Sequence, residues 1–192
     1  MSKLNSITQE AYADEKVVLA EGRRQRHRVE VFAISADNKV LATSTAINGY
    51  LELPGGGINV NEDALAAAIR ETEEEAGWTV INPRLIEVRG NWGYAAPEGS
   101  WLKHNGYDEE VNFVVACDAV EFKPKENFRS EGDGRTHELL PIEQIVKETV
   151  YGMNDSDDTR VKLLGQLRLS AIKILFGEQQ VQLESLPLYS KW

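Results

Sequence analysis

Apolar and polar positions along the chain follow two periods, and these predict the secondary structure. Alternation of apolar with polar residues, rich in β-branched side chains, predicts strands at 29–35, 39–45, 50–53, 79–89, 110–121 and 138–140. Apolar residues at helical spacing predict helices at 62–76, from 141 to about 150, and at 159–176, where Asp157 or Asp158 is the expected N-cap. Because strands and helices interleave, we expect an α/β fold with a mixed β-sheet between helices.

The length fits one domain, and no repeat or low-complexity segment divides the chain. We therefore predict a single domain over residues 1–192, with a weakly helical N-terminal arm at 1–22. Residues 178–192 are expected to form a C-terminal tail that includes one strand at 180–183.

The most distinctive stretch runs from Gly55 to Trp78 and predicts a glycine loop followed by a helix. Gly55, Gly56 and Gly57 follow Pro54, and glycine allows a backbone to approach a ligand closely. Asn61 is the expected N-cap, and Gly77 is placed to end the helix. The expected buried stripe consists of Leu65, Ile69, Thr72 and Ala76.

Three carboxylates occur at spacings that place them on one patch of this helix. Glu71, Glu74 and Glu75 stand at i, i+3 and i+4, where like charges destabilise a helix by roughly 0.2–0.5 kcal/mol per pair. A divalent cation would relieve that repulsion, and hard cations such as Mg²⁺ prefer oxygen ligands. The alternative interpretation is a solvated acidic helix face.

The spacing of the fixed residues resembles the Nudix box. Gly56 is followed after five residues by Glu62, and after seven more by Arg70-Glu71-Thr72-Glu73-Glu74-Glu75-Ala76-Gly77-Trp78. The fixed polar and glycine positions are all present. Thr72 and Trp78 stand where the family usually has aliphatic residues, and both are expected on the apolar side of the helix, where they affect packing more than chemistry.

The resemblance implies an α/β/α sandwich and a hydrolase that uses Mg²⁺ or Mn²⁺. The substrate would be a small nucleoside diphosphate derivative: a dinucleoside polyphosphate, a nucleotide sugar or a nucleoside triphosphate. Water would attack a phosphorus of its pyrophosphate. Carried onto this chain, the metal ligands are Glu71, Glu74, Glu75 and the Gly55 carbonyl, and Gly55, Gly56 and Gly57 line the substrate site. Arg70 completes the catalytic set and is expected to form a charge-assisted contact with Glu62.

The general base is left open by the resemblance, since it can be a box glutamate or a carboxylate of a later loop. We favour Glu131 and Asp133 as later-loop candidates, ahead of Glu98 and Glu110. The alternative for Glu131 and Asp133 is that they are turn residues between glycines. The three histidines, His27, His104 and His137, have no ligand spacing and are expected to be structural or at the surface.

Two further segments are candidates for substrate contact. Residues 90–108 are expected to form a long irregular loop rich in aromatic residues, in which Trp92 and Tyr94 would stack on a nucleobase. The alternative is that these rings pack as a small satellite of the core. The basic residues between Arg23 and Arg28 are either a solvated flank before a strand or a contact for substrate phosphate or a partner.

Composition narrows the class of function. The net charge is −10, and residues 62–75, with six acids and one base, supply half of it. This acidity disfavours binding to a nucleic acid polymer. The single cysteine, Cys117, cannot form an intramolecular disulfide and fits a reducing, cytoplasmic location, and no apolar run of membrane-spanning length occurs. A homodimer is left open.

Two alternatives to an active pyrophosphohydrolase are kept. The first is a non-catalytic Nudix-like nucleotide sensor or regulator, which would usually lack box carboxylates. The second is a relative of the isoprenoid-diphosphate isomerases, which would need a cysteine in a site loop, whereas Cys117 falls in an expected core strand.

Overall fold

The computed structural model describes residues 16–18, 22–44, 51–88, 93–96, 98–124, 128 and 136–181. Its strands are β1 (Lys16–Val18), β2 (Arg24–Ile34), β3 (Val40–Ser44), β4 (Leu51–Glu52), β5 (Trp78–Ile86), β6 (Gly93–Ala95), β7 (Glu109–Phe122) and β8 (Thr136–Leu140). Its helices are α1 (Ala64–Ala76), α2 (Trp101–His104), α4 (Ile142–Asp155), α5 (Thr159–Phe176) and the 3₁₀ helix η2 (Glu178–Val181).

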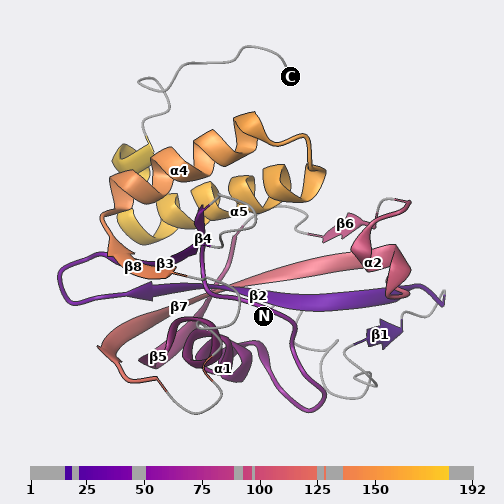
Figure 1. Ribbon diagram of the computed structural model, residues 1–192, viewed down its shortest axis with the longest axis horizontal. Helices are drawn as coiled ribbons and strands as arrows, with labels where there is room; N and C mark the ends of the chain where they lie inside the picture. The colour runs from indigo at the N-terminus through magenta and orange to yellow at the C-terminus, as the bar shows by residue number, and fades with distance from the viewer. Residues whose placement is uncertain are drawn as a thin grey trace.

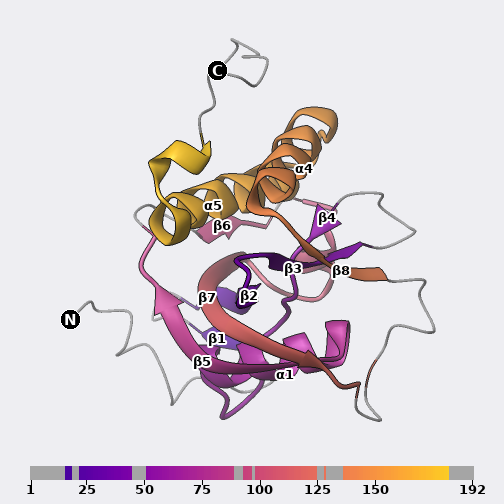
Figure 2. The same cartoon turned by 90° about the vertical axis from the view of Figure 1, so that its left-hand side faces the viewer.

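One mixed sheet forms the middle layer of the molecule. Its main path runs β4-β3-β2-β7-β5, and β1, β6 and β8 pair with β2, β7 and β3 respectively. The central pair β2–β7 is parallel, whereas the other strand pairs are antiparallel. Helix α1 covers one face of this sheet, and α4 and α5 cover the other (Figures 1 and 2). The predicted α/β fold, an α/β/α sandwich with a mixed β-sheet, is therefore confirmed.

Alternation along β2 divides the core into two parts. Val29, Val31 and Ala33 pack toward α1, whereas Phe32 packs toward α4 and α5. The strand is buried on both faces because helices cover both sides of the sheet centre. Cys117 is also buried in the α1 part of the core, as expected for a core strand.

The central strand begins earlier than its apolar pattern indicates. β2 starts at Arg24, so the basic residues 24–28 are part of the sheet, and the interpretation as a solvated flank is wrong for His27 and Arg28, which are buried. The reason is cross-strand pairing, since residues 25–34 of β2 pair in register with β7. Gln25 and Arg26 hydrogen-bond to Glu109 and Glu110 of that strand. Polar partners thus extend a strand beyond its hydrophobic part.

Other predictions about the sheet are corrected by the structure. The apolar residues of 79–89 favour a buried strand or a pair of strands, but the segment forms the single strand β5, which is not buried, since Ile81 is 48% and Leu85 40% exposed. It is the last strand on the main path, and register shifts at Thr79/Val80 and Ile81/Arg84 interrupt its pairing with β7.

At the two ends of the chain, the described residues also differ from the predictions. Within the expected helical arm, Lys16–Val18 is a strand. In the tail, Glu178–Val181 is a 3₁₀ helix rather than the start of a strand, and residues 182–183 lie outside the described residues.

On the second face α5 begins at its predicted residue, and α4 begins at Ile142, one residue after its predicted start. Of the two predicted caps, Asp158 is the N-cap of α5 and accepts a 2.8 Å hydrogen bond from the Arg160 amide, and α5 ends at Phe176. α4 extends further than expected, to Asp155. No helix in the described ranges has both the length and the apolar character needed to cross a membrane.

Candidate active site

The glycine loop is held against the central strand by backbone hydrogen bonds. The Val29 amide donates to the Gly56 carbonyl at 2.9 Å, and the Val31 amide donates to the Pro54 carbonyl at 2.8 Å. On the far side of the loop, the Ile58 amide donates to the His27 carbonyl at 3.0 Å. The loop therefore runs beside β2 like an additional edge strand. The Gly55 carbonyl is not an acceptor in any of these three hydrogen bonds.

Helix α1 begins two residues later than predicted. Asp63, not Asn61, is the N-cap, and its carboxylate accepts a 2.8 Å hydrogen bond from the Ala66 amide. Asn61 instead has a φ of 63°, a left-handed turn conformation that asparagine tolerates. Gly77 ends the helix as predicted, with a φ of 67° and its amide bonded to the Glu73 carbonyl.

The buried side of α1 is displaced from the predicted stripe. Thr72 and Ala76 are buried as expected, but Leu65 and Ile69 are only partly buried. The other buried positions are Ala67, Ala68 and Glu71. Small alanines at the contact allow the helix to lie close to the sheet, so the larger residues remain at the margin.

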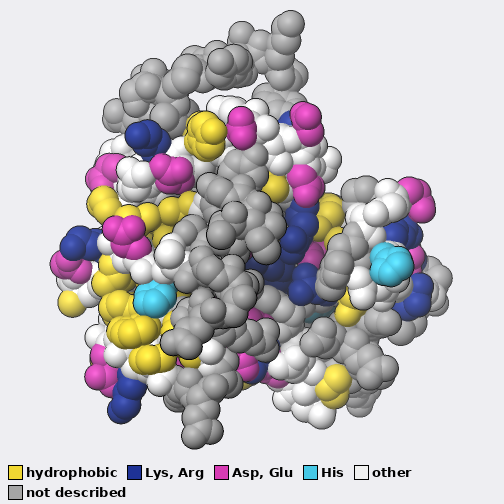
Figure 3. Space-filling model, viewed as in Figure 1, with side chains coloured by type: hydrophobic (Ala, Val, Ile, Leu, Met, Phe, Trp, Pro, Cys, Tyr) yellow, Lys and Arg dark blue, Asp and Glu magenta, His cyan; other side chains and the backbone are white. Residues whose placement is uncertain are grey.

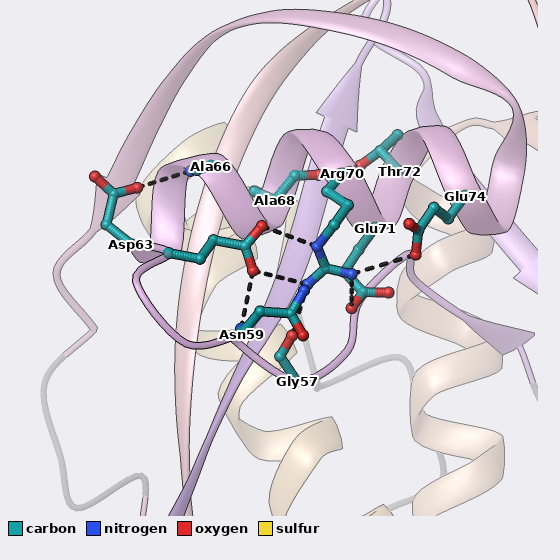
Figure 4. Close-up of polar contacts among 10 residues, drawn as sticks. Gly57, Asn59, Asp63, Ala66, Ala68, Arg70, Glu71, Thr72 and Glu74 are labelled. Carbon is teal, nitrogen blue, oxygen red and sulfur yellow. Dashed lines mark hydrogen bonds and ion pairs between the residues drawn. The ribbon is translucent and has the colours of Figure 1, made fainter. Parts of the chain in front are cut away.

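Arg70 is the centre of the polar contacts around the loop (Figure 4). It forms two hydrogen bonds with Glu62, from Nε to Oε1 at 2.8 Å and from Nη2 to Oε2 at 2.9 Å, which confirms the predicted contact. Its Nη2 also donates to the Gly57 carbonyl at 2.7 Å. The hydrogen bonds to Glu62, and the charges of Glu71 and Glu62, outweigh burial and raise the pKa of Arg70. This side chain therefore joins helix and loop as a permanent cation.

The same guanidinium contacts two of the three predicted ligands. Arg70 Nη1 lies 2.7 Å from Glu71 Oε1 and 3.2 Å from Glu74 Oε2. Burial raises the pKa of Glu71, Arg70 opposes this, and the neighbouring charges of Glu75 and Glu74 raise it further. The ionised form of Glu71 is thus less favourable here than it is in water.

Glu71 lies directly against the glycine loop. A Cβ atom built on Gly56 would lie 2.3 Å from Glu71 Oε1, so a residue other than glycine would displace this carboxylate. Glu75 also contacts the loop, accepting a 2.9 Å hydrogen bond from the Gly55 amide. Two of the three carboxylates therefore reach the loop from the same helix face.

Comparison with known proteins identifies the family. The family model for the NUDIX domain matches residues 24–158, more than half of the chain. The chain belongs to the Nudix family. Its residues 55–78 are therefore the Nudix box, and α1 is the box helix.

The curated relatives cover parts of the chain. Nudix hydrolase 25 of Arabidopsis thaliana is 37% identical over 35% of this chain and 38% of its own length. The RNA pyrophosphohydrolase of Pelagibacter ubique is 30% identical over 52% of this chain and 69% of its own length. The chain thus spans about two fifths of the first of these Nudix relatives and about two thirds of the second.

Solved structures also match this Nudix chain. A NUDIX hydrolase from Nitrosomonas europaea has a TM-score of 0.49 at 19% identity, covering 74% of this chain and 87% of its own. A structure from a study of MutT from Aliivibrio salmonicida and Vibrio cholerae has a TM-score of 0.45 at 18% identity, covering 74% of this chain and 98% of its own.

Nudix proteins typically use a divalent metal, and the box offers a suitable set of donors. The carboxylates of Glu71, Glu74 and Glu75 and the Gly55 carbonyl are hard oxygen ligands, which fit Mg²⁺ and Mn²⁺. Within the described ranges, however, no three acidic, histidine or cysteine side chains converge as a ready-made metal site. Arg70 lies against Glu71 and Glu74, so those carboxylates would have to turn from it to share a cation.

Outside the Nudix box, the predicted site residues are placed unequally. Trp92, Glu131 and Asp133 lie outside the described residues. Tyr94 is buried in a small cluster with Ala96, Leu102 and Tyr107, so its ring packs inside the domain, and its stacking role stays a prediction. The segment around it is not one irregular loop, since it contains β6 and α2.

The two minor candidates for general base differ in their surroundings. Glu98 is exposed. Glu110 is fully buried, and its carboxylate is already bound by Arg26, Arg160 and the Tyr94 hydroxyl. These three donors hold Glu110 as a charged structural group.

A buried ion pair on the α5 side of the sheet is absent from the sequence predictions. Arg168 of α5 donates to Glu30 of β2 through Nη2 and to the Leu51 carbonyl through Nη1 at 3.2 Å. Arg168 also lines a cavity of about 220 Å³ between β4, α4 and α5, together with Glu52, Thr149 and Val161. The partners are 138 residues apart, so no local pattern could have revealed the pair.

Proposed function

We propose that this protein is a divalent-metal-dependent pyrophosphohydrolase acting on a nucleoside diphosphate derivative. One observation carries the proposal: the carboxylates of Glu71 and Glu75 lie against the glycine loop, which leaves room for that of Glu71 only because Gly56 has no side chain. A site for phosphates needs backbone that can approach closely and oxygen ligands beside it for a cation. Both features occur here in one loop–helix unit.

Glu71, Glu74, Glu75 and the Gly55 carbonyl would hold the cation, which would supply charge neutralisation on the pyrophosphate oxygens. Arg70 holds the loop and the box helix together through Glu62 and Gly57. It thereby keeps Glu71 and the glycines in one geometry. The Gly55 to Gly57 backbone would face the phosphates.

In the proposed reaction the oxygen of a water molecule forms a bond to one phosphorus. The bond from that phosphorus to the bridging oxygen breaks, and the leaving phosphate takes the electron pair. A general base accepts the proton of the water, and we keep the box glutamates, Glu131 and Asp133 as its candidates. On the nucleoside side, Trp92 and Tyr94 remain our proposed contacts.

The experiment is a panel of substrates with Mg²⁺ and, separately, with Mn²⁺. It contains a dinucleoside polyphosphate, a nucleotide sugar and a nucleoside triphosphate, with phosphate release measured after coupling to a phosphatase. We expect metal-dependent release from at least one of them. An RNA bearing a 5′-triphosphate is added because the relative from Pelagibacter ubique is named an RNA pyrophosphohydrolase. Turnover of that RNA alone would contradict the small-molecule assignment.

The sensor alternative is separated in the same panel. A non-catalytic nucleotide sensor would bind one of the nucleotides, measured by calorimetry, without releasing phosphate under either metal. That result would overturn the proposed activity while leaving the family assignment intact.

A further inference from the structure

Charged side chains occupy the face of the sheet that lies under α5. Even-numbered residues of β2 point to this face, as shown by Glu30, which pairs with Arg168 of α5. Arg26 and Arg28 lie four and two residues before Glu30, and because every second side chain of a strand points to the same face, they lie on the face of Glu30. Figure 3 shows Lys and Arg side chains gathered near the middle of the molecule, below the helical layer.

Among the described residues, the two buried carboxylates on this face each pair with an arginine, although Oε2 of Glu30 has no hydrogen-bond partner there. Glu30 pairs with Arg168. Glu110 pairs with Arg26 and, at 3.2 Å, with Arg160 of α5. Burial of the Glu110 carboxyl pushes its pKa upward, but Arg160, Arg28 and Arg26 outweigh this and lower it. Glu110 is therefore fully used as a counter-ion.

Arg28 differs from these arginines. It is 9% exposed, and its Nη1 is buried without a hydrogen-bond partner among the described residues. It acts on Glu110 through charge, and among the described residues the hydrogen bonds to that carboxylate come from Arg26, Arg160 and Tyr94. A buried guanidinium without a hydrogen-bonded counter-ion is costly, and an oxyanion would satisfy it.

The position of Arg28 links this face to the glycine loop. Arg28 forms an isolated β-bridge with Gly57, the glycine whose carbonyl accepts from Arg70. The residues on either side of Arg28, His27 and Val29, make the hydrogen bonds that hold the loop. The backbone of Arg28 is thus the direct neighbour of the glycine loop in the sheet, and its side chain leaves the sheet at that point on the α5 face.

We infer that Arg28 is the main residue of an anion-binding subsite under α5 that takes a phosphoryl group of the substrate. The inference rests on the proposed function, since it assigns the anion to the nucleotide that the box would cleave. Guanidinium groups match phosphate oxygens in a two-pronged geometry, which a lysine cannot reproduce. Arg160, partly exposed at the start of α5 and close to Glu52, lies at the margin of the same subsite.

The test is the thermal stability of the metal-free protein, measured in EDTA at constant ionic strength. With inorganic phosphate at about ten times its Kd, we expect the Tm to rise by a few degrees, about 3 °C or more. AMP should produce the same shift at a lower concentration, and adenosine, which has no phosphate, should produce less. Because no turnover is needed, failure of the proposed hydrolysis would leave this result unchanged.

Arg28→Met should lower phosphate and AMP affinity at least about tenfold, the scale of a lost charge-assisted hydrogen bond. Its ligand-free Tm should be equal to or above that of the wild type, because a buried cation whose Nη1 has no hydrogen-bond partner among the described residues has been removed. Arg24→Met is the matched control, since Arg24 lies on the same strand but is exposed, and it should keep the phosphate shift. Arg28→Lys, which keeps the charge, should fold and retain part of the affinity.

Three results would overturn the inference. The first is a wild-type protein with no Tm shift from phosphate or AMP. The second is an Arg28→Met variant that is destabilised and still binds both ligands as the wild type does, which would make Arg28 a structural partner of Glu110. The third is phosphate binding with no stronger binding of AMP, which would assign the subsite to free phosphate and not to the substrate.

Discussion

Arg70 and Glu62 form a two-pronged ion pair across the glycine loop, with N–O distances of 2.8 and 2.9 Å. The carboxylate of Glu62 also accepts a 2.9 Å hydrogen bond from the Asn59 amide. The pair therefore fixes both the position of the helix and the path of the loop, and it explains why the box needs an arginine in this position.

Arg70→Lys tests that explanation. Lysine keeps one positive charge but cannot contact Glu62 twice and Gly57 at the same time. We expect the free energy of unfolding to fall by about 2 kcal/mol, between the values for exposed and buried pairs, because both side chains are only partly buried. Urea denaturation measures it. Arg84→Lys, in the exposed pair with Asp118, is the control and should change stability by less than about 0.5 kcal/mol. Equal effects at the two sites would contradict the account.

Gly56→Ala tests the contact between the loop and Glu71. The new Cβ would lie 2.3 Å from the Glu71 carboxylate, so this side chain must move. We expect turnover to fall by about 10²-fold, because small misplacements in a site have effects of that size. In a Glu71→Ala background the same substitution should cost less stability, giving a coupling of about 0.5 kcal/mol or more in a double-mutant cycle. Additive effects on stability would show that the two residues do not conflict.

A pH dependence of stability follows from His27. Burial lowers the pKa of His27 from 6.5 to about 4. Between these values the unfolded chain binds a proton that the folded protein does not, so this stability is present above pH 6.5 and is lost as the pH falls toward 4. The loss would amount to at most about 3 kcal/mol.

The measurement for His27 is a series of urea denaturations from pH 7 to pH 4. His27→Gln should lose stability less steeply than the wild type over this range. His104→Gln, which changes an exposed histidine, should follow the wild-type curve. Parallel curves for the wild type and His27→Gln would refute the assignment.

The fold was largely predictable because its hydrophobic pattern is strong. The start of α5, a cap at Asp157 or Asp158 and the helix end at Gly77 all follow from local patterns. The errors occur where polar partners distant in sequence replace apolar contacts. The first half of β2 is a strand because Gln25 and Arg26 hydrogen-bond to residues of β7. These partners are distant in sequence, so a local pattern of alternating apolar residues does not reveal them.

In the candidate site, too, local motifs could be predicted from the sequence and contacts between distant residues could not. The Glu62–Arg70 contact could be predicted because both residues belong to one motif with fixed spacing. The N-cap was misplaced because Asn61 and Asp63 are both good caps, and only the left-handed turn at Asn61 decides between them. Arg28 was merely one residue of a basic cluster in the sequence, and its burial beside Gly57 depends on the sheet register.

Divalent metal should stabilise the folded protein. The carboxylates of Glu74 and Glu75 both raise the pKa of Glu71 through their charge, so a shared cation would relieve an unfavourable interaction present only in the folded state. We expect millimolar Mg²⁺ or Mn²⁺ to raise the Tm by a few degrees, about 2–4 °C for each 1 kcal/mol of binding free energy. A Glu71→Gln variant should show a smaller shift. Identical melting curves with and without either metal would favour a solvated acidic face.

The most direct test of the account is the Mg²⁺-dependent turnover of Glu75→Gln on the best substrate of the panel. Glu73→Gln is the matched control, because it makes the same change of charge on the same helix outside the predicted ligand set. We predict that Glu75→Gln lowers kcat by about 10²-fold or more, the scale of a lost electrostatic group in an active site, while the fold and the turnover of Glu73→Gln are preserved. Unchanged turnover in Glu75→Gln, or an equal loss in both variants, would contradict the claim that the box glutamates hold a catalytic metal.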